Sequence, residues 1–350
     1  MARLSGLCYR PTDQLSDSLD KEGLRLISSG QTHFTRWYVA DAPAADGSMD
    51  DKGPLAPGAS NSGKEEQASN AKGAHTTVHG VSSKAAKMQR IVMMRGVVWR
   101  TAEFDTRLWQ DMIKFWPATF EGTFTQPRDT LVAHAGMGDM AQLLFTDLRP
   151  FLLEASTRRQ PVTFGGHSLG GAFALLMACM ACLRVQMPSD AISCYAFGAP
   201  PVLSLAESSA ARNVMEVVNL PDGSVKSFVL DNDPIPRAML SVDPTFALLK
   251  QSAPLSFLLE TRKRLFGSGA SFTPERFLYE NVGDVYLIRW TAESGQRVSL
   301  LAPSQMEEQL KLAVEELMRT PAALMQALLD HSHGSYSQEL YAAARQLEQR

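Results

Sequence analysis

The segment from Val162 to Val185 constrains the fold more than any other part of the chain. It reads VTFGGHSLGGAFALLMACMACLRV, so a glycine-rich start with one histidine and one serine leads into a long apolar run. The uninterrupted apolar part begins only at Ala172, which leaves it shorter than the roughly 20 residues that a membrane-spanning helix needs. The segment therefore predicts a buried strand, a tight turn and a helix that is buried on all sides.

Strand-like and helix-like patterns alternate on both sides of this segment. Strands are predicted at Arg90–Met94, Thr130–Gly136, Ala191–Pro200, Val225–Asp233 and Gly283–Trp290, and helices at Thr101–Trp116 and Gly138–Ala155. Strands and helices that alternate at short intervals indicate an α/β fold with a mostly parallel central sheet and helices on both faces.

Residues 41–87 differ sharply in composition from the rest. They are rich in Gly, Ala, Ser and Lys and contain almost no large apolar side chain, which predicts a disordered insertion. The insertion separates residues 1–40, expected to supply a helix and a strand, from a main domain at 88–350.

Composition and cysteine usage exclude several classes of function. A net charge of −3 and a pI near 6.2 argue against nucleic acid as a partner. The four cysteines form no disulfide framework, and the pair Cys179 and Cys182 lies in the apolar run without a second pair, so we interpret both as core residues. No phosphate-binding loop and no metal-ligand spacing is present, so no cofactor and no metal is expected.

The N-terminus lacks the continuous apolar stretch of a secretory signal. Together with the short apolar run, this predicts an intracellular protein, either cytoplasmic or peripheral on a lipid or membrane surface.

Residues Gly166 to Gly170 form a G-x-S-x-G motif between the predicted strand and helix, with Ser168 at its centre. This context is the one that a nucleophile elbow requires, because Gly166 and Gly170 allow strand and helix to pass closely while the serine hydroxyl stays exposed. The alternative is an ordinary glycine-rich turn of an α/β protein.

The segment VTFGGHSLGGAFALLMA resembles the nucleophile motif of class 3 lipases, a branch of the α/β-hydrolases. Other segments match the motifs of that family in the same order, namely IVMMRGV, VAHAGM, CYAFGAPPV, DNDPIPR and DHSHGSY. The resemblance covers roughly residues 90–237 well and 283–340 loosely. It implies an α/β-hydrolase fold, a serine nucleophile and a lid in the segment after the oxyanion loop. Residues 238–280 are an extra piece between the acid and the last strand, and their apolar clusters and basic residues favour a lid or interfacial insertion.

In α/β-hydrolases the acid and then the histidine follow the serine along the chain. Only His331 and His333 lie downstream of Ser168. The family pattern favours His331 as the base, because Asp330 precedes it and Tyr336 follows, and it leaves His333 as a solvated neighbour. A closer tyrosine, found in some members, would instead favour His333.

The family pattern assigns the acid to Asp233, directly before a stiff Pro-Ile-Pro turn. Asp231 is the alternative, with a turn-capping role if Asp233 is the acid. The backbone N–H groups of Leu169 and Val97 are expected to form the oxyanion hole. Val97 departs from the family, which has Thr or Ser there, so the backbone donor is retained but the orienting hydroxyl is lost.

The sequence thus predicts a serine ester hydrolase that cleaves acyl glycerolipids at a lipid or membrane surface. Phospholipase A1 or galactolipase activity is an alternative within the same class, and a catalytically weak lipase-like interaction protein is an alternative outside it. Two apolar segments, residues 99–124 and 246–266, favour a lipid substrate, although both would also suit helices packed on the sheet.

Overall fold

The computed structural model describes residues 1–43, 88–96, 114, 117–121, 130–205, 213–230, 232–238, 279–291, 295–302, 305 and 320–348. The insertion predicted at 41–87 and the lid predicted at 238–280 lie almost wholly outside the described residues. The same holds for the helix predicted at Thr101–Trp116, of which only Lys114 is described.

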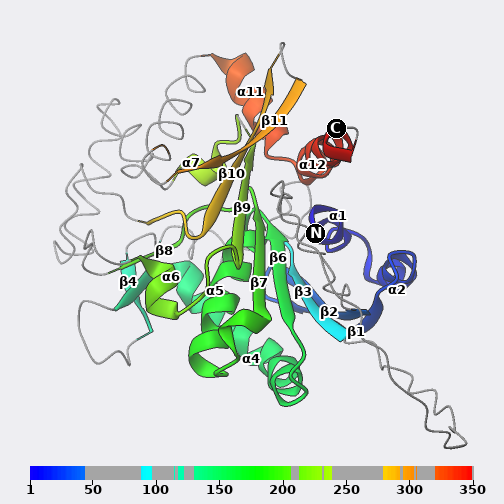
Figure 1. The fold of residues 1–350 in the computed structure, drawn as a ribbon, viewed down its shortest axis with the longest axis vertical. Coiled ribbons are helices and arrows are strands. Elements are labelled where there is room, and N and C mark those ends of the chain that lie inside the picture. Colours follow the sequence, from blue (N-terminus) through cyan, green and yellow to red (C-terminus); the bar gives the residue numbers. More distant parts are fainter. Residues whose placement is uncertain are drawn as a thin grey trace, which may run out of the picture.

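An eight-stranded sheet forms the centre of the molecule (Figure 1). In spatial order its strands are β1 (Arg25–Thr32), β2 (Thr35–Pro43), β3 (Met88–Met94), β6 (Val162–His167), β7 (Ile192–Phe197), β9 (Val225–Leu230), β10 (Asp284–Thr291) and β11 (Gly295–Leu301). Neighbours from β3 to β10 are parallel, and the remaining pairs at the two edges are antiparallel. The predicted mostly parallel sheet is confirmed, and the carboxyl ends of its parallel strands meet at one edge.

Helices cover both faces of this sheet. The larger ones are α4 (Ala135–Thr157), α5 (Leu169–Arg184), α11 (Pro321–Asp330) and α12 (His333–Glu348), and the shorter ones are α1 (Ala2–Leu7), α2 (Leu15–Asp20), α6 (Val214–Val218), α7 (Ile235–Ala238), η1 (Thr12–Gln14) and η3 (Ser189–Ala191). Alternate residues of β3 point to opposite faces. Val92 packs in the core built with α4 and α5, whereas Met93 packs with α1 and α2. In Figure 1, α1 and α12, from opposite ends of the chain, lie together on one side of the sheet.

Three details of the architecture differ from the sequence-based expectation. Residues 1–43 supply two strands to the sheet, β1 and β2, where one was expected. Strand β11, which was not predicted, follows β10 as an antiparallel hairpin partner. The strand predicted at Thr130–Gly136 corresponds to β5 (Leu131–His134), which pairs with β4 (Pro117–Glu121) and β8 (Leu203–Leu205) in a separate antiparallel sheet.

A buried arginine ties the antiparallel edge of the sheet to helix α4. The Arg90 side chain is 1% exposed and donates to both carboxylate oxygens of Asp41 on β2, at 2.9 and 3.1 Å. It also donates to Glu154 on α4 at 2.8 Å. Burial raises the pKa of Asp41, but the hydrogen bonds and charge of Arg90, with smaller contributions from Gln160 and Arg25, lower it further, so the net pKa lies below the ordinary value.

We expect Arg90→Ala to lower the free energy of unfolding by about 3–5 kcal/mol, because it leaves a buried carboxylate without its partner. Arg25→Ala is the matched control. Arg25 is 71% exposed and lies 3.6 Å from the same carboxylate, so its loss should cost less than about 1 kcal/mol. Urea denaturation of both variants measures the difference, and equal losses would contradict the structural role given to Arg90.

Candidate active site

Ser168 occupies the turn between β6 and α5, at the carboxyl edge of the sheet. Its backbone has φ 58° and ψ −132°, a strained combination for any residue other than glycine. The Ser168 N–H donates to the carbonyl of Phe197 on β7 at 2.8 Å, which holds the turn to the neighbouring strand. This strained turn directs the hydroxyl away from the sheet, which is the geometry of a nucleophile elbow.

The glycines around Ser168 are required by close backbone approaches. A β-carbon on Gly166 would lie 2.3 Å from the backbone of Gly170, and one on Gly170 would lie 2.2 Å from the carbonyl oxygen of Met94 on β3. Both distances are far below van der Waals contact, and the obstructing atoms belong to backbone. Any larger residue at either position would separate α5 from the strands and displace the turn that carries Ser168.

Three side chains from distant parts of the chain meet at this turn. His331 Nε2 lies 2.9 Å from Ser168 Oγ, and His331 Nδ1 lies 2.9 Å from each carboxylate oxygen of Asp233. Asp233 is fully buried, and the other two are 8% exposed. With the Nδ1–H of His331 donating to Asp233, Nε2 is free to accept the proton of the serine hydroxyl.

Asp233 is fixed by groups from two helices, α7 and α12. Its Oδ1 accepts from the N–H of Ile235 at 2.9 Å, and its Oδ2 accepts from the hydroxyl of Tyr336 at 2.5 Å. The fully buried Arg237 donates to the backbone carbonyl of Asp233 at 3.1 Å. Burial, then the charge and hydrogen bond of Asp233, hold the pKa of Tyr336 well above its ordinary value, so this hydroxyl remains a donor to the carboxylate.

The two groups predicted for the oxyanion hole are only partly described. Leu169 is the first residue of α5, so its N–H is among those left without a partner inside the helix. Val97 lies outside the described residues, but Gly96 directly before it is described. A β-carbon on Gly96 would lie 2.9 Å from Ser168 Cβ and 3.2 Å from Leu169 N, so the loop after β3 begins against the nucleophile turn.

The alternative site residues can be compared with this arrangement. Asp231 lies outside the described residues. Among the described residues, no hydrogen bond joins His333 to Ser168 or Asp233. The expectation that His333 is a solvated neighbour is wrong, because the side chain is half-buried against α1 and its Nε2 donates to the carbonyl of Ala2 at 3.0 Å. Packing between the two ends of the chain causes this burial.

Sequence reasoning named no role for Tyr9 and Arg237. The Tyr9 hydroxyl lies 3.1 Å from His167 Nδ1, directly beside the nucleophile turn. No local pattern around Tyr9 marks it, since the contact joins residues 158 positions apart.

No group of three or more His, Cys, Asp or Glu side chains in the described part of the chain is arranged to hold a metal ion. The cysteines are free thiols, and burial raises the pKa of Cys182 to about 11. None of the described helices is long and apolar enough to cross a membrane.

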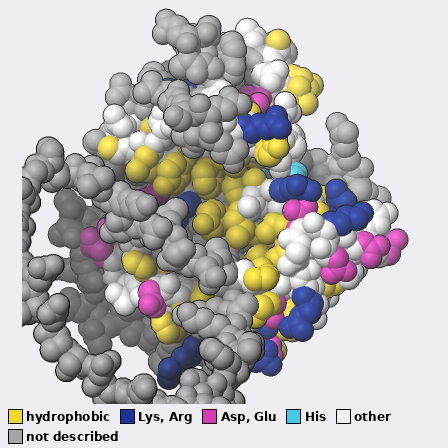
Figure 2. Space-filling view, turned by 45° about the vertical axis from the view of Figure 1, so that its right-hand side comes forward, with side chains coloured by type: hydrophobic (Ala, Val, Ile, Leu, Met, Phe, Trp, Pro, Cys, Tyr) yellow, Lys and Arg dark blue, Asp and Glu magenta, His cyan; other side chains and the backbone are white. Residues whose placement is uncertain are grey.

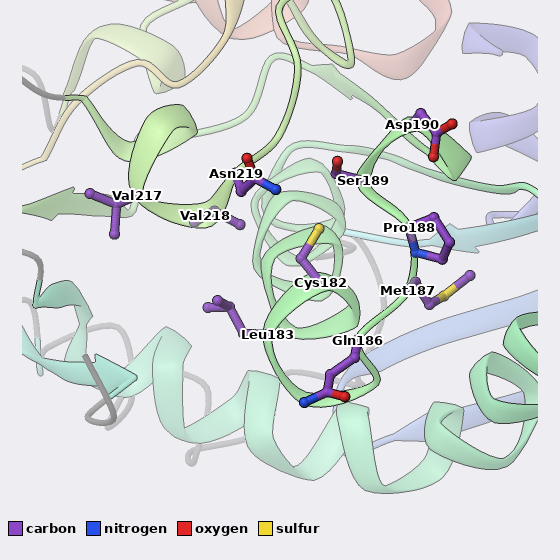
Figure 3. A pocket seen from close by; sticks show the side chains of 10 residues that line it. All are labelled: Cys182, Leu183, Gln186, Met187, Pro188, Ser189, Asp190, Val217, Val218 and Asn219. Atoms are coloured by element: carbon purple, nitrogen blue, oxygen red, sulfur yellow. The ribbon is translucent and has the colours of Figure 1, made fainter. Parts of the chain in front are cut away.

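A cavity of about 570 Å³ lies at the far end of α5 from Ser168 (Figure 3). It is lined by Cys182, Leu183, Gln186, Met187, Pro188, Ser189, Asp190, Val217, Val218 and Asn219. Because α5 has 16 residues and each adds about 1.5 Å, this cavity lies roughly 20 Å from the nucleophile turn. It is therefore separate from the site of any chemistry at Ser168.

His167 is neutral in the folded protein. Burial, followed by the charges of His331 and His333, holds its pKa well below the ordinary value, and only the hydrogen bond to the carbonyl of His331 opposes this. Burial also lowers the pKa of His333. In the unfolded chain both histidines titrate near pH 6.5. Below that pH the unfolded state binds protons that the folded state does not, so acid favours unfolding.

We therefore expect the free energy of unfolding to fall as pH is lowered from 7 to 5, by up to about 1.4 kcal/mol per pH unit for each such histidine. His167→Asn should remove part of this slope. Urea denaturation at several pH values measures it, and an identical slope in the wild type and the variant would contradict the neutral state assigned to His167.

Residues 96–242 match the family model of class 3 lipases. Phospholipase A1 PLIP2 of Arabidopsis thaliana, a chloroplastic protein, is 24% identical over 185 residues, which make up 52% of this chain and 23% of the relative. Phospholipase A1 PLIP1 of the same organism, also chloroplastic, is 27% identical over 185 residues, or 52% of this chain and 26% of the relative. The chain thus matches about a quarter of the length of these relatives.

Among solved structures, a fungal lipase in complex with an inhibitor has a similar fold. The TM-score is 0.50 at 17% sequence identity, and the match covers 86% of this chain and 82% of the fungal one. Together with the strand order, this identifies the fold as that of an α/β-hydrolase. The match of residues 96–242 to the class 3 lipase model confirms the resemblance that the motifs of this chain predict.

Proposed function

We propose that this chain is a serine ester hydrolase that cleaves acyl esters of glycerolipids, with Ser168 as nucleophile, His331 as base and Asp233 as acid. The observation that carries the proposal is the continuous chain of hydrogen bonds from Ser168 Oγ through His331 to Asp233, built on a strained turn. Such a constellation activates a hydroxyl that is otherwise a weak nucleophile.

In the proposed reaction, Ser168 Oγ attacks the ester carbonyl while His331 Nε2 takes the serine proton. The oxyanion that develops accepts hydrogen bonds from the N–H groups of Leu169 and, as the family pattern implies, Val97. His331 then passes its proton to the departing alcohol, and an acyl-enzyme remains on Ser168. Water, deprotonated by the same histidine, releases the fatty acid, while Asp233 holds the imidazole in one orientation throughout.

The proposal is tested by incubating the purified protein with a panel of triacylglycerol, diacylglycerol, phosphatidylcholine and galactolipid vesicles. We expect free fatty acid from at least one glycerolipid with the wild type and none with Ser168→Ala. Absence of fatty acid from every lipid, and from a soluble short-chain ester, would favour the catalytically weak lipase-like protein instead.

Phospholipase A1 activity is the second candidate, because both Arabidopsis relatives carry that name. The two candidates differ in the panel result. A phospholipase A1 releases the fatty acid from the sn-1 position of phosphatidylcholine, whereas a triacylglycerol or diacylglycerol lipase acts on the neutral lipids.

A lipid or membrane surface is the proposed partner, and exposed apolar side chains on the helix that precedes the base support it. Met325 and Leu329 lie one turn apart on α11, are 61% and 52% exposed, and precede His331 in the chain. Figure 2 shows that hydrophobic side chains also gather at the centre of one face, with charged side chains toward its right-hand side. Exposed apolar side chains of this kind bind lipid when they enter the acyl region.

Met325→Asp with Leu329→Asp tests this surface. We expect hydrolysis of vesicle lipid to fall about tenfold or more, since each large apolar side chain contributes roughly 1.5–3 kcal/mol when buried in lipid. Hydrolysis of a soluble ester should stay the same. Leu143→Asp, on an exposed position of α4, is the matched control, and an equal loss in this control would contradict the assignment of the surface to α11.

A further inference from the structure

The hydroxyl of Tyr9 lies between two parts of the candidate site that are far apart in sequence. It accepts a hydrogen bond from the N–H of Gly96 at 3.2 Å, at the start of the loop after β3. The same oxygen lies 3.1 Å from Nδ1 of His167, the residue before the nucleophile. On the other side of that ring, His167 Nε2 lies 2.7 Å from the backbone carbonyl of His331.

One protonation state satisfies every bond in this chain. A carbonyl oxygen can only accept, so His167 Nε2 carries the proton that bonds to His331. His167 Nδ1 is then an acceptor for the hydroxyl proton of Tyr9, and the oxygen of Tyr9 remains free to accept from Gly96. Burial and the neighbouring histidines hold the pKa of His167 well below its ordinary value, which agrees with a neutral ring that has one donor and one acceptor.

We infer that Tyr9 is a positioning residue, whose hydroxyl joins the loop of the oxyanion hole to His167 and through it to the backbone of the base. This inference rests on the proposed function, because it assigns Tyr9 a role in the chemistry at Ser168.

The position of Gly96 explains how Tyr9 acts on the oxyanion hole. Gly96 lies against Ser168 and Leu169, and it immediately precedes Val97, the expected second donor. Val97 has no hydroxyl with which to hold its own loop in place. A hydrogen bond from the N–H of Gly96 to Tyr9 fixes the peptide unit directly before this donor. Donors that are fixed before the reaction stabilise the developing oxyanion most effectively.

The other end of the chain acts on the base. His167 Nε2 donates a hydrogen bond to the backbone carbonyl of His331. This bond fixes the main chain from which the imidazole of His331 extends. The His167 and His331 rings also pack against each other, with centroids 4.9 Å apart. Loss of the Tyr9 hydroxyl therefore frees His167 to take the other tautomer and weakens its hold on His331.

The first helix is anchored firmly enough to place Tyr9. His333 Nε2 on α12 donates to the carbonyl of Ala2 on α1 at 3.0 Å. The ring of Tyr9 also packs beside that of His333, with centroids 5.6 Å apart. The segment that positions the site therefore lies outside residues 96–242, the part that matches the lipase family.

Tyr9→Phe tests the inference, with Tyr38→Phe as the matched control. Each variant removes one tyrosine hydroxyl from the N-terminal part of the fold, but only Tyr9 touches the candidate site. With a soluble short-chain ester, we expect Tyr9→Phe to lower kcat on the order of 10- to 100-fold with KM within about threefold of the wild type. Tyr38→Phe should lower the melting temperature at least as much and leave kcat within about twofold.

An unchanged kcat in Tyr9→Phe, or an equal fall in both variants, would overturn the inference and reduce Tyr9 to a packing role. A second readout is the 15N NMR signal of His167. In the wild type it should report a neutral ring that is protonated at Nε2. The Nδ1 resonance should shift in Tyr9→Phe and should stay at its wild-type position in Tyr38→Phe. The failure of the proposed function is distinguishable, because a wild type that neither hydrolyses the ester nor reacts with a fluorophosphonate contradicts that function directly.

Discussion

Ser168→Ala is expected to lower kcat for ester hydrolysis about 10³-fold or more while the protein stays folded. The serine oxygen is the atom that would form the acyl-enzyme, and members of such a triad act as a unit, so removal of one removes most of the acceleration. In the structure the Ser168 hydroxyl bonds only to His331 among the described side chains, so its loss should hardly change the melting temperature. Steady-state kinetics with a soluble ester, together with thermal melting, measures both effects.

Ser332→Ala is the control for this experiment. Ser332 directly follows the proposed base, but its hydroxyl is exposed and bonds to Ser335. We expect it to retain nearly full activity. Residual hydrolysis in purified Ser168→Ala at the level of the wild type would show that another residue is the nucleophile.

His331→Ala should reduce kcat as severely as Ser168→Ala, because the serine then has no base and the acid has nothing to orient. His333→Ala should have a much smaller effect on kcat, since its ring contacts α1 and makes no bond to Ser168. It should instead lower the melting temperature, because it releases the N-terminal helix. The reverse ranking of the two kcat values would assign the base to His333.

The arrangement of side chains around Ser168 was predictable because the residues that determine it are close in sequence or few in number. The glycines that flank Ser168 lie within two residues of it, and their close approach to β3 in the structure is the reason why the motif is recognisable. Only two histidines follow Ser168, so few partners had to be compared. The mostly parallel sheet was predictable for a similar reason, since each strand and helix carries its own periodicity.

The remaining features depend on contacts between distant segments, and no local pattern encodes them. His333 is half-buried because α1 packs on α12, at the opposite end of the chain. β5 has the apolar sequence of a central strand, yet it pairs with β4 and β8 outside the main sheet. Tyr9 reaches His167 across 158 positions of sequence, which only the folded arrangement reveals.

The central claim, that Ser168 is an activated nucleophile, is tested most directly by covalent labelling. An alkyl fluorophosphonate should react with the wild type, losing fluoride and forming a bond from phosphorus to Ser168 Oγ. Peptide mass spectrometry should then locate a single adduct on the peptide that contains Ser168. Ser168→Ala and His331→Ala should remain unlabelled under the same conditions, and Ser332→Ala should be labelled like the wild type. A wild type that stays unlabelled, or an adduct on a different serine, would contradict the account.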